Sequence, residues 1–91
     1  MKIINVQFSD DGWENYQGWF RSGDKKSLKK INDLIDDIKK NGLLVGIGEP
    51  EKLRYRKDEY SRKINKGDRL IYTQKGDCLI IISCKGHYND K

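Results

Sequence analysis

The sequence predicts a small α+β domain in which an N-terminal helical hairpin packs on one face of a mainly antiparallel sheet. Three observations favour this class. An alternating strand-like segment is followed by two segments with helical spacing, and several short β-forming segments separated by turn sequences come after them. The chain has 91 residues, which is the size of one domain, so we expect residues 1–91 to form a single unit.

The first three elements are assigned from periodicity and capping. Residues 2–8 alternate as in a strand, and Ser9 with the two acids after it is typical of a helix N-terminus. The aromatic stripe of Trp13, Tyr16 and Phe20 has helical spacing and is expected in the core, whereas Trp19 is a candidate for a protruding contact. A second helix over residues 25–41 carries one apolar stripe and ends at Gly42.

Four short strands are predicted after the Gly- and Pro-containing loop at residues 46–50. They cover residues 52–55, 60–64, 69–73 and 78–85. The turns at residues 65–68 and 74–77 both contain Lys-Gly-Asp, which indicates consecutive hairpins. Residues 78–82 are apolar on both faces, so this strand is expected to be central. The predicted order is therefore β-α-α-β-β-β-β, with four or five strands and a mixed edge.

Charge and cysteine content narrow the classes of function. The net charge is +5, and residues 52–69 hold eight basic side chains against three acidic ones. Such a stripe suits a polyanion such as RNA, DNA or an acidic protein, or else it is a solvated edge that discourages aggregation. One histidine and two cysteines exclude a disulfide framework and a four-ligand zinc site. We expect a reduced, cytoplasmic protein without a metal or a membrane span, with Cys78 and Cys84 on the same side of their strand in the core.

Three side chains are candidates for acid–base chemistry. His87 titrates near neutral pH and follows the last strand, Glu51 enters the first strand of the meander, and Arg69 begins a central strand. A carboxylate, an imidazole and a guanidinium are sufficient for metal-free RNA cleavage. One group takes the proton from the 2′-hydroxyl, another protonates the departing 5′-oxygen, and the cation stabilises the charged transition state.

Neighbouring basic residues extend this candidate site. Arg54, Arg62 and Lys63 lie on adjacent predicted strands and are expected to line the same face as substrate contacts. The alternative from the residues alone is a surface salt-bridge network in which Glu51 pairs with Arg54 or Arg62. Both interpretations stay open at this point.

Several short motifs, in a fixed order over essentially the whole chain, resemble those of one toxin family. They are Trp13-Glu14-Asn15-Tyr16, Lys29-Lys30-Ile31-Asn32-Asp33-Leu34-Ile35, Gly46-Ile47-Gly48-Glu49-Pro50-Glu51-Lys52-Leu53, Tyr60-Ser61-Arg62-Lys63-Ile64, Asp68-Arg69-Leu70-Ile71-Tyr72 and Ser83-Cys84-Lys85-Gly86-His87-Tyr88. In these motifs the chain resembles the YoeB/Txe type of toxin in the RelE/ParE superfamily. The resemblance implies a fold like that of microbial ribonucleases. It also implies ribosome-dependent cleavage of mRNA in the A site, without a cofactor.

The resemblance also implies a role for each matching residue. Glu51 is the implied general base, His87 the general acid and Arg69 the phosphate-stabilising group, while Tyr88 orients the substrate or supports the acid. Arg54 and Lys63 occupy positions of basic substrate-contacting residues in the family. The chain departs from the family pattern in four places: Lys63 replaces an arginine, residues 55–59 are about one residue shorter, Asp68 replaces a basic residue, and Gly86 replaces a bulkier one, which predicts a more mobile tail.

The partners that the resemblance implies are an acidic antitoxin of the YefM/Axe kind, the ribosome with its mRNA, and a second copy of the chain in a homodimer. Promoter DNA is expected as a partner only through the antitoxin. Two alternative functions stay open. One is non-enzymatic inhibition of DNA gyrase, as in toxins that resemble ParE, and the other is RNA binding without chemistry. The combined presence of Glu51, Arg69 and His87 speaks against the gyrase alternative.

Overall fold

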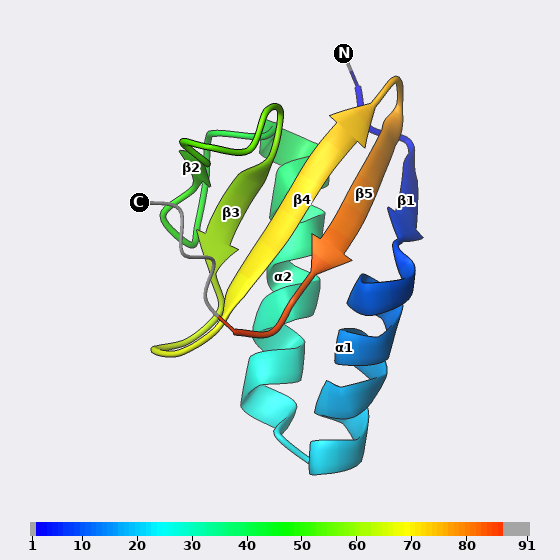
Figure 1. Cartoon of the computed structure of the whole chain (residues 1–91), viewed down its shortest axis with the longest axis vertical. Coiled ribbons are helices and arrows are strands. Elements are labelled where there is room, and N and C mark those ends of the chain that lie inside the picture. Colours follow the sequence, from blue (N-terminus) through cyan, green and yellow to red (C-terminus); the bar gives the residue numbers. More distant parts are fainter. Residues whose placement is uncertain (1, 87–91) are drawn as a thin grey trace.

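The computed structural model describes residues 2–86. The elements follow the predicted order (Figure 1): β1 (Asn5–Phe8), α1 (Asp10–Ser22), α2 (Lys25–Asn41), β2 (Glu51–Lys52), β3 (Tyr60–Lys63), β4 (Arg69–Lys75) and β5 (Cys78–Ser83). The predicted α+β class and element order are confirmed. Helix α2 has the predicted bounds, whereas β1, β2, β3 and β5 are shorter than predicted and β4 is longer.

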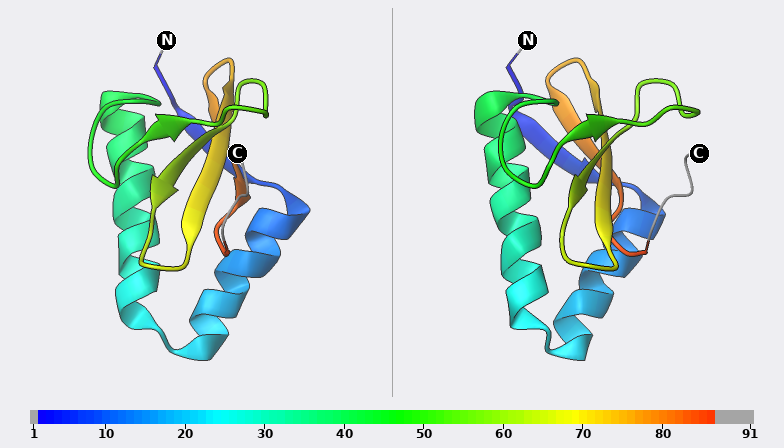
Figure 2. Two further views of the ribbon diagram at one scale, coloured as in Figure 1. Left: turned by 60° about the vertical axis from the view of Figure 1, so that its left-hand side comes forward. Right: turned by 90° about the vertical axis from the view of Figure 1, so that its left-hand side faces the viewer.

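The five strands form one mixed sheet in the order β1-β5-β4-β3-β2. Strands β2 to β5 pair antiparallel with their sequence neighbours, as the hairpin turns predict. Strand β1 pairs parallel with β5. The two helices carry the chain from β1 to β2 at the opposite edge, and the antiparallel strands then return it to β5 beside β1. Both helices lie on one side of the sheet (Figure 2), which leaves its other face available for a site.

Local capping defines the ends of both helices. The Ser9 hydroxyl accepts a hydrogen bond from the Gly12 N–H at 3.0 Å, and Gly23 ends α1 with φ +76°. The Asp24 carboxylate then accepts from the Ser27 N–H at 3.0 Å and begins α2. These bonds satisfy N–H groups that have no partner within the helix, which is why the boundaries were predictable from sequence.

The core lies between α2 and the helix-facing side of β4 and β5. Its main side chains are Ile31, Leu34, Ile38, Leu70, Tyr72, Leu79 and Ile81, all fully buried. The predicted burial of the α2 stripe is therefore confirmed for Ile31, Leu34, Ile35 and Ile38.

Helix α1 faces the sheet with a different stripe from the one predicted. Trp19 is buried and its Nε1 donates to the Cys84 carbonyl at 2.8 Å, whereas Trp13 and Phe20 are 50% and 64% exposed. Gly12 and Trp19 are the buried residues of α1, the partly buried Asn15 between them accepts from the Cys84 N–H, and Tyr16 of the predicted stripe packs partly against the core. A β-carbon on Gly12 would collide with the Ile81 carbonyl oxygen, so glycine permits this close approach of helix and strand.

A register shift in the β4–β5 pair reverses the orientation of the end of β5. Ile71 pairs with Ser83 but Tyr72 pairs with Ile81, so one extra residue lies in β5. Cys84 is consequently fully buried while Cys78 is partly exposed, and the prediction that both face the same side is wrong. Burial, and then the negative charge of Asp68, raise the pKa of Cys84 to about 12.

Candidate functional site

Glu51 and Arg69 meet on the sheet face opposite the helices. Glu51 pairs with Ser61 across β2 and β3, and an Arg69 Nη2 lies 3.7 Å from a Glu51 carboxylate oxygen. The Glu51 side chain is 62% exposed and the Arg69 side chain 18% exposed. The carboxylate is therefore accessible to a ligand, while the guanidinium is held within the protein surface.

The backbone and a buried hydroxyl orient Arg69. Its Nε donates to the Ser61 hydroxyl at 3.0 Å and its Nη2 to the Glu49 carbonyl at 3.4 Å. Lys63 stands directly opposite Arg69 in the β3–β4 pair, and like charges at such a position are destabilising unless an anion lies between them. Sequence reasoning missed Ser61, although its alternation with Lys63 places both side chains on one face.

The chain segment that leads to His87 is attached beside Arg69. The Gly86 N–H donates to the Asp68 carboxylate at 2.7 Å, and the Gly86 carbonyl accepts from the Arg69 N–H at 3.1 Å. Gly86 has φ +81°, a conformation that glycine adopts without strain. Both backbone groups of Gly86 are therefore bonded, whereas the tail that was expected to be more mobile lies outside the described residues. His87 and Tyr88 themselves lie outside the described residues.

Arg62 is not on the site face. Its side chain is fully buried on the helix side of β3, and its Nε donates to the Tyr72 hydroxyl at 3.0 Å. Its two Nη atoms donate to the Asp37 carboxylate and to three backbone carbonyls, those of Ile47, Gly42 and Val45. The expectation that Arg62 lines the substrate surface is corrected, because successive residues of a strand point to opposite faces and Lys63 takes the outer one.

The buried arginine organises the loop that precedes Glu51. Burial acts to raise the pKa of the Asp37 carboxyl, but hydrogen bonds from Arg62 and from the Ile47 N–H outweigh it and hold the pKa below its usual value. A β-carbon on Gly46 would overlap the Asp37 carboxylate, so this glycine lets the loop close over the ion pair. Loop residues 42–48 are thereby tied to α2 and β3 just before the chain reaches Glu51.

Arg54 lies in the segment that connects β2 to β3. It is exposed, and its guanidinium lies 5.9 Å from the centre of the Tyr55 ring. The same segment crosses the open face of the sheet, where the Thr73 hydroxyl donates to the Asp58 carbonyl at 2.5 Å. Leu53 of this segment and Ile71 of β4 are both buried, apart from the main core.

A second surface of interest is the aromatic patch, which consists of Phe8, Trp13, Tyr16 and Phe20. Its rings are in mutual contact, with centroids 5.2 to 6.3 Å apart. Trp13 and Phe20 are half or more exposed. Contiguous exposed aromatic rings of this kind mark interaction surfaces.

Residues 2–86 contain neither a cluster of metal ligands nor a membrane-spanning helix. No three His, Cys, Asp or Glu side chains in this range come together as a metal ion would require. Neither helix there has the length and apolar character needed to cross a membrane.

Comparison with known proteins gives consistent matches. Residues 8–88 match the family model of the YoeB-like toxin of bacterial type II toxin–antitoxin systems. A toxin YoeB from Synechocystis sp. is 43% identical over 86 residues, covering 93% of this chain and 98% of that protein. A toxin YoeB from Escherichia coli K12 is 37% identical over 89 residues, covering 97% and 100% of the two chains.

Solved structures agree with the sequence matches. A YoeB dimer from Staphylococcus aureus superposes with a TM-score of 0.85 at 46% identity, covering 93% of this chain and 98% of that one. A heterotetrameric YoeB–YefM toxin–antitoxin complex from the same organism contains a chain with a TM-score of 0.83 at 46% identity and the same coverage. A YoeB/ParE toxin from Agrobacterium tumefaciens matches with a TM-score of 0.88 at 32% identity, covering 93% of this chain and 100% of that one.

Proposed function

Because this chain belongs to the YoeB-like toxin family of bacterial type II toxin–antitoxin systems, we propose that it is an endoribonuclease that cleaves translated mRNA in the ribosomal A site. The observation that carries the proposal is the Glu51–Arg69 pair on the open sheet face, with Gly86 bonded beside it. Gly86 precedes His87, so a base, a cation and the attachment point of an acid converge there.

In the proposed reaction Glu51 removes the proton from a ribose 2′-hydroxyl. The freed oxygen attacks the adjacent phosphorus, the bond from phosphorus to the 5′-oxygen breaks, and His87 protonates that oxygen as it leaves. The products are a 2′,3′-cyclic phosphate and a free 5′-hydroxyl. Arg69 stabilises the negative charge that accumulates on the phosphorus-bound oxygens, with Lys63 next to it, and Tyr88 supports the acid or the substrate.

The ordering of Arg69 makes this role physically reasonable. Its Nε donates to the Ser61 hydroxyl, and its Nη2 donates one hydrogen to the Glu49 carbonyl. Its Nη1 has no hydrogen-bond partner within residues 2–86. Those remaining N–H groups can contact a phosphate without a conformational change. Donors oriented before the reaction contribute more to catalysis than donors that must reorganise.

The test uses ribosomes stalled on a defined mRNA, with mapping of the cleavage ends. We expect the wild-type protein to cut within the A-site codon and to leave a 2′,3′-cyclic phosphate. Loss of one acid–base group lowers the rate by about 10²–10⁴-fold, so Glu51→Ala and His87→Gln are expected to be slowed to that extent. Glu14→Ala, an exposed carboxylate on α1, serves as the matched control.

The outcomes separate the alternatives. A folded wild-type protein that cuts no ribosome-bound mRNA would exclude the endoribonuclease, and inhibition of DNA gyrase would be measured next. Full activity of His87→Gln would remove the acid role, and RNA binding without cleavage would leave a binding module.

We further propose two protein partners. An acidic antitoxin segment covers the basic sheet face of Lys63 and Arg69 and so blocks Glu51, and a second copy of the chain contacts the aromatic patch. The S. aureus relatives support both, since one forms a dimer and another a complex with YefM. Titration with the cognate antitoxin is expected to abolish cleavage, and an antitoxin complex that cleaves at the wild-type rate would contradict this assignment.

A further inference from the structure

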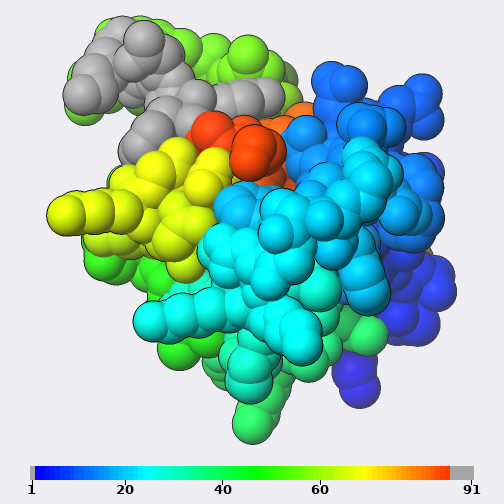
Figure 3. Space-filling view, turned by 90° about the horizontal axis from the view of Figure 1, so that it is seen from below, coloured from blue at the N-terminus to red at the C-terminus, as the bar shows by residue number. Residues whose placement is uncertain are grey.

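Two adjoining hollows form a continuous depression between α2 and the end of β3. Their volumes are about 520 and 300 Å³, and both are lined by Lys30, Ile64 and Asn65. Figure 3 views the face on which the first turns of α2 and the β3–β4 turn lie on either side of this depression. We call it the lysine trough, after Lys26 and Lys30 from α2 and Lys63 and Lys66 from the sheet side.

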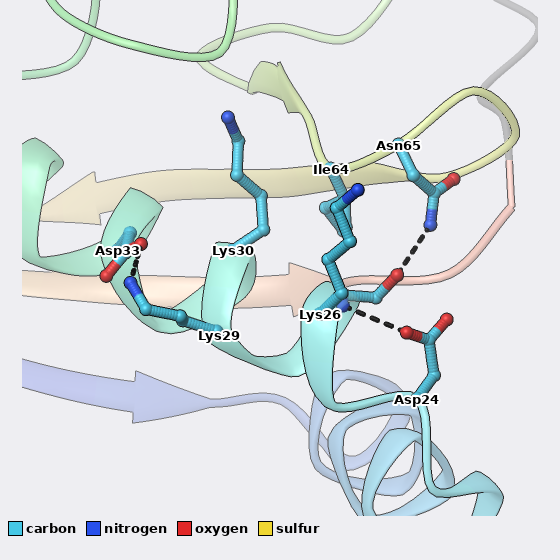
Figure 4. A pocket seen from close by; sticks show the side chains of 8 residues that line it. Asp24, Lys26, Lys29, Lys30, Asp33, Ile64 and Asn65 are labelled. Carbon is cyan, nitrogen blue, oxygen red and sulfur yellow. Dashed lines mark hydrogen bonds and ion pairs between the residues drawn. The ribbon is translucent and has the colours of Figure 1, made fainter.

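The walls of the trough are joined by side-chain hydrogen bonds. Asn65 donates to the Ser27 hydroxyl at 3.0 Å, and Asp24 accepts from the Ser27 N–H (Figure 4). Ile64 is buried beneath them. Lys26 and Lys30 extend from α2 on the side where Ile64 and Asn65 lie (Figure 4). The depression is therefore preformed, which lowers the entropy lost on binding.

Five lysines and three carboxylates line the trough, so its charge is net positive. Within residues 2–86, Lys26, Lys30, Lys63 and Lys66 form no ion pair, whereas the Lys29 ammonium is paired with Asp33 at 2.9 Å. Lys26 and Lys30 are four residues apart on one helix face, an arrangement in which like charges repel. A bound anion would relieve this repulsion.

The trough opens onto the proposed active site. Gly48 and Glu49 line its second hollow, Glu49 is two residues before Glu51, and the Glu49 carbonyl accepts the hydrogen bond from Arg69. We propose that the lysine trough binds the phosphate backbone of the mRNA strand next to the cleaved bond. This inference rests on the proposed function, and it identifies where the substrate continues beyond the reacting nucleotide.

The lining favours RNA over an acidic peptide. Ile64 is the one large apolar side chain that lines the trough, and only 6% of it is exposed. A peptide would therefore find no apolar anchor there. The exposed apolar side chains Trp13, Phe20, Leu44 and Val45 line neither hollow. Lysine ammonium groups contact phosphates as flexible point charges and do not read bases, so binding here is expected to be independent of sequence.

The experiment measures the salt dependence of RNA binding. The probe is a fluorescent single-stranded RNA with a 2′-deoxy substitution at the cleaved position, followed by anisotropy between about 50 and 200 mM salt. We compare wild type with Lys26→Gln/Lys30→Gln, and with Lys39→Gln/Lys40→Gln as the charge-matched control at the other end of α2. Circular dichroism and thermal melting confirm that each variant is folded.

Loss of two phosphate contacts should make the slope of log K against log salt less steep by about 1.4, since each contact to a single strand contributes about 0.7. If the lines meet at 1 M salt, the affinity at 0.1 M falls on the order of 25-fold. The control variant is expected to keep the wild-type slope. A trough variant with the slope of the control, or a wild-type protein that binds no RNA at low salt, would overturn the inference.

Two further measurements distinguish failure of this inference from failure of the proposed function. A polyglutamate peptide that binds the trough as well as RNA does would reassign it to an acidic protein partner and overturn the inference. Cleavage of ribosome-bound mRNA is measured in parallel with the same variants. If the wild type binds RNA through the trough but cuts nothing, the RNA surface is supported and the proposed cleavage alone fails.

Discussion

Arg62 uses all five of its N–H groups inside the protein. They bond to the Tyr72 hydroxyl, the Asp37 carboxylate and three backbone carbonyls of the loop before Glu51. A buried guanidinium is tolerated only when its hydrogen bonds and its charge are both satisfied, and this one meets both conditions. Arg62 therefore acts on the site indirectly, through the loop that delivers Glu51.

Replacement of Arg62 is expected to destabilise the fold. Arg62→Met leaves the partly exposed Asp37 carboxylate without its ion-pair partner and three loop carbonyls without their donor, and we expect a loss of about 3 kcal/mol or more. Arg62→Lys keeps the charge but loses the fork of donors, and we expect it to be destabilised as well. Urea unfolding measures both. Arg21→Lys, whose partner Glu14 is 75% exposed, is the control and should change stability by less than about 0.5 kcal/mol.

The pH dependence of stability tests the same pair. Because the folded-state pKa of Asp37 is lowered from 3.8, its ionised form adds stability above that pH, and this stability is lost as the pH falls through the folded pKa. Asp37→Asn is thus expected to be less stable than wild type at neutral pH, by an amount that shrinks in acid. A constant difference across the acid range would contradict the assignment.

At the scale of the elements, close contacts of helix and strand depend on single residues. Gly12 lies against the Ile81 backbone, whereas a β-carbon on Gly18 of the same helix meets nothing within 4 Å. Each of the two glycines lowers the stability of α1 by the same amount, because glycine has a low helix propensity. Only Gly12 is required by the packing of α1 against β5.

The two Gly→Ala substitutions should therefore change the stability of the protein in opposite directions. Gly18→Ala is expected to stabilise the protein by about 0.5–1 kcal/mol through helix propensity. Gly12→Ala forces α1 away from β5 and is expected to destabilise it by about 2 kcal/mol or more, in the range of overpacked cores. Chemical denaturation of both variants measures the difference. Equal effects would mean that α1 does not rest on β5 as described.

The junction between β5 and the C-terminal residues is the second element-scale contact. Asp68→Ala removes the acceptor of the Gly86 N–H, so we expect cleavage of ribosome-bound mRNA to slow by about 10-fold or more, with little change in substrate affinity. Asp68→Asn keeps an acceptor oxygen and should lose less. Asp77→Ala, in the β4–β5 turn, carries the same charge change as a control.

Hydrogen exchange gives this prediction a readout that does not depend on activity. The Gly86 amide should lose protection in Asp68→Ala but keep it in the control. Unchanged exchange together with unchanged cleavage would show that Asp68 does not anchor the junction.

At the scale of the whole molecule, the two faces of the domain have different characters. The open sheet face carries the polar cluster of Glu51, Lys63 and Arg69, while α1 and the edge strand β1 present the aromatic patch. Rings that are exposed in one copy can be buried between two, so the patch suits self-association and leaves the site face open.

Self-association through the patch is tested by sedimentation. Trp13→Glu and Phe20→Glu place a charge among the rings and should weaken the dimer at least about 10-fold, as truncation of aromatic hot spots does. Leu44→Glu, which is also on an exposed apolar side chain but outside the patch, should leave the dimer unchanged. If all three variants keep the dimer fraction of the wild-type protein, the aromatic patch is not the dimer contact.

Local sequence determined the elements of this protein and the chemical groups it has available. Helix α2 runs from Lys25 to Asn41 between the caps Asp24 and Gly42, as predicted, because capping bonds and the apolar period act within a few residues. Tertiary structure decided which groups meet. Trp19 is inside because Gly12 allows β5 to approach, Cys84 is buried because of the extra residue in β5, and Arg62 is satisfied by residues 10 to 25 positions away. Long-range pairing sets these orientations, so residue types and spacing could not reveal them.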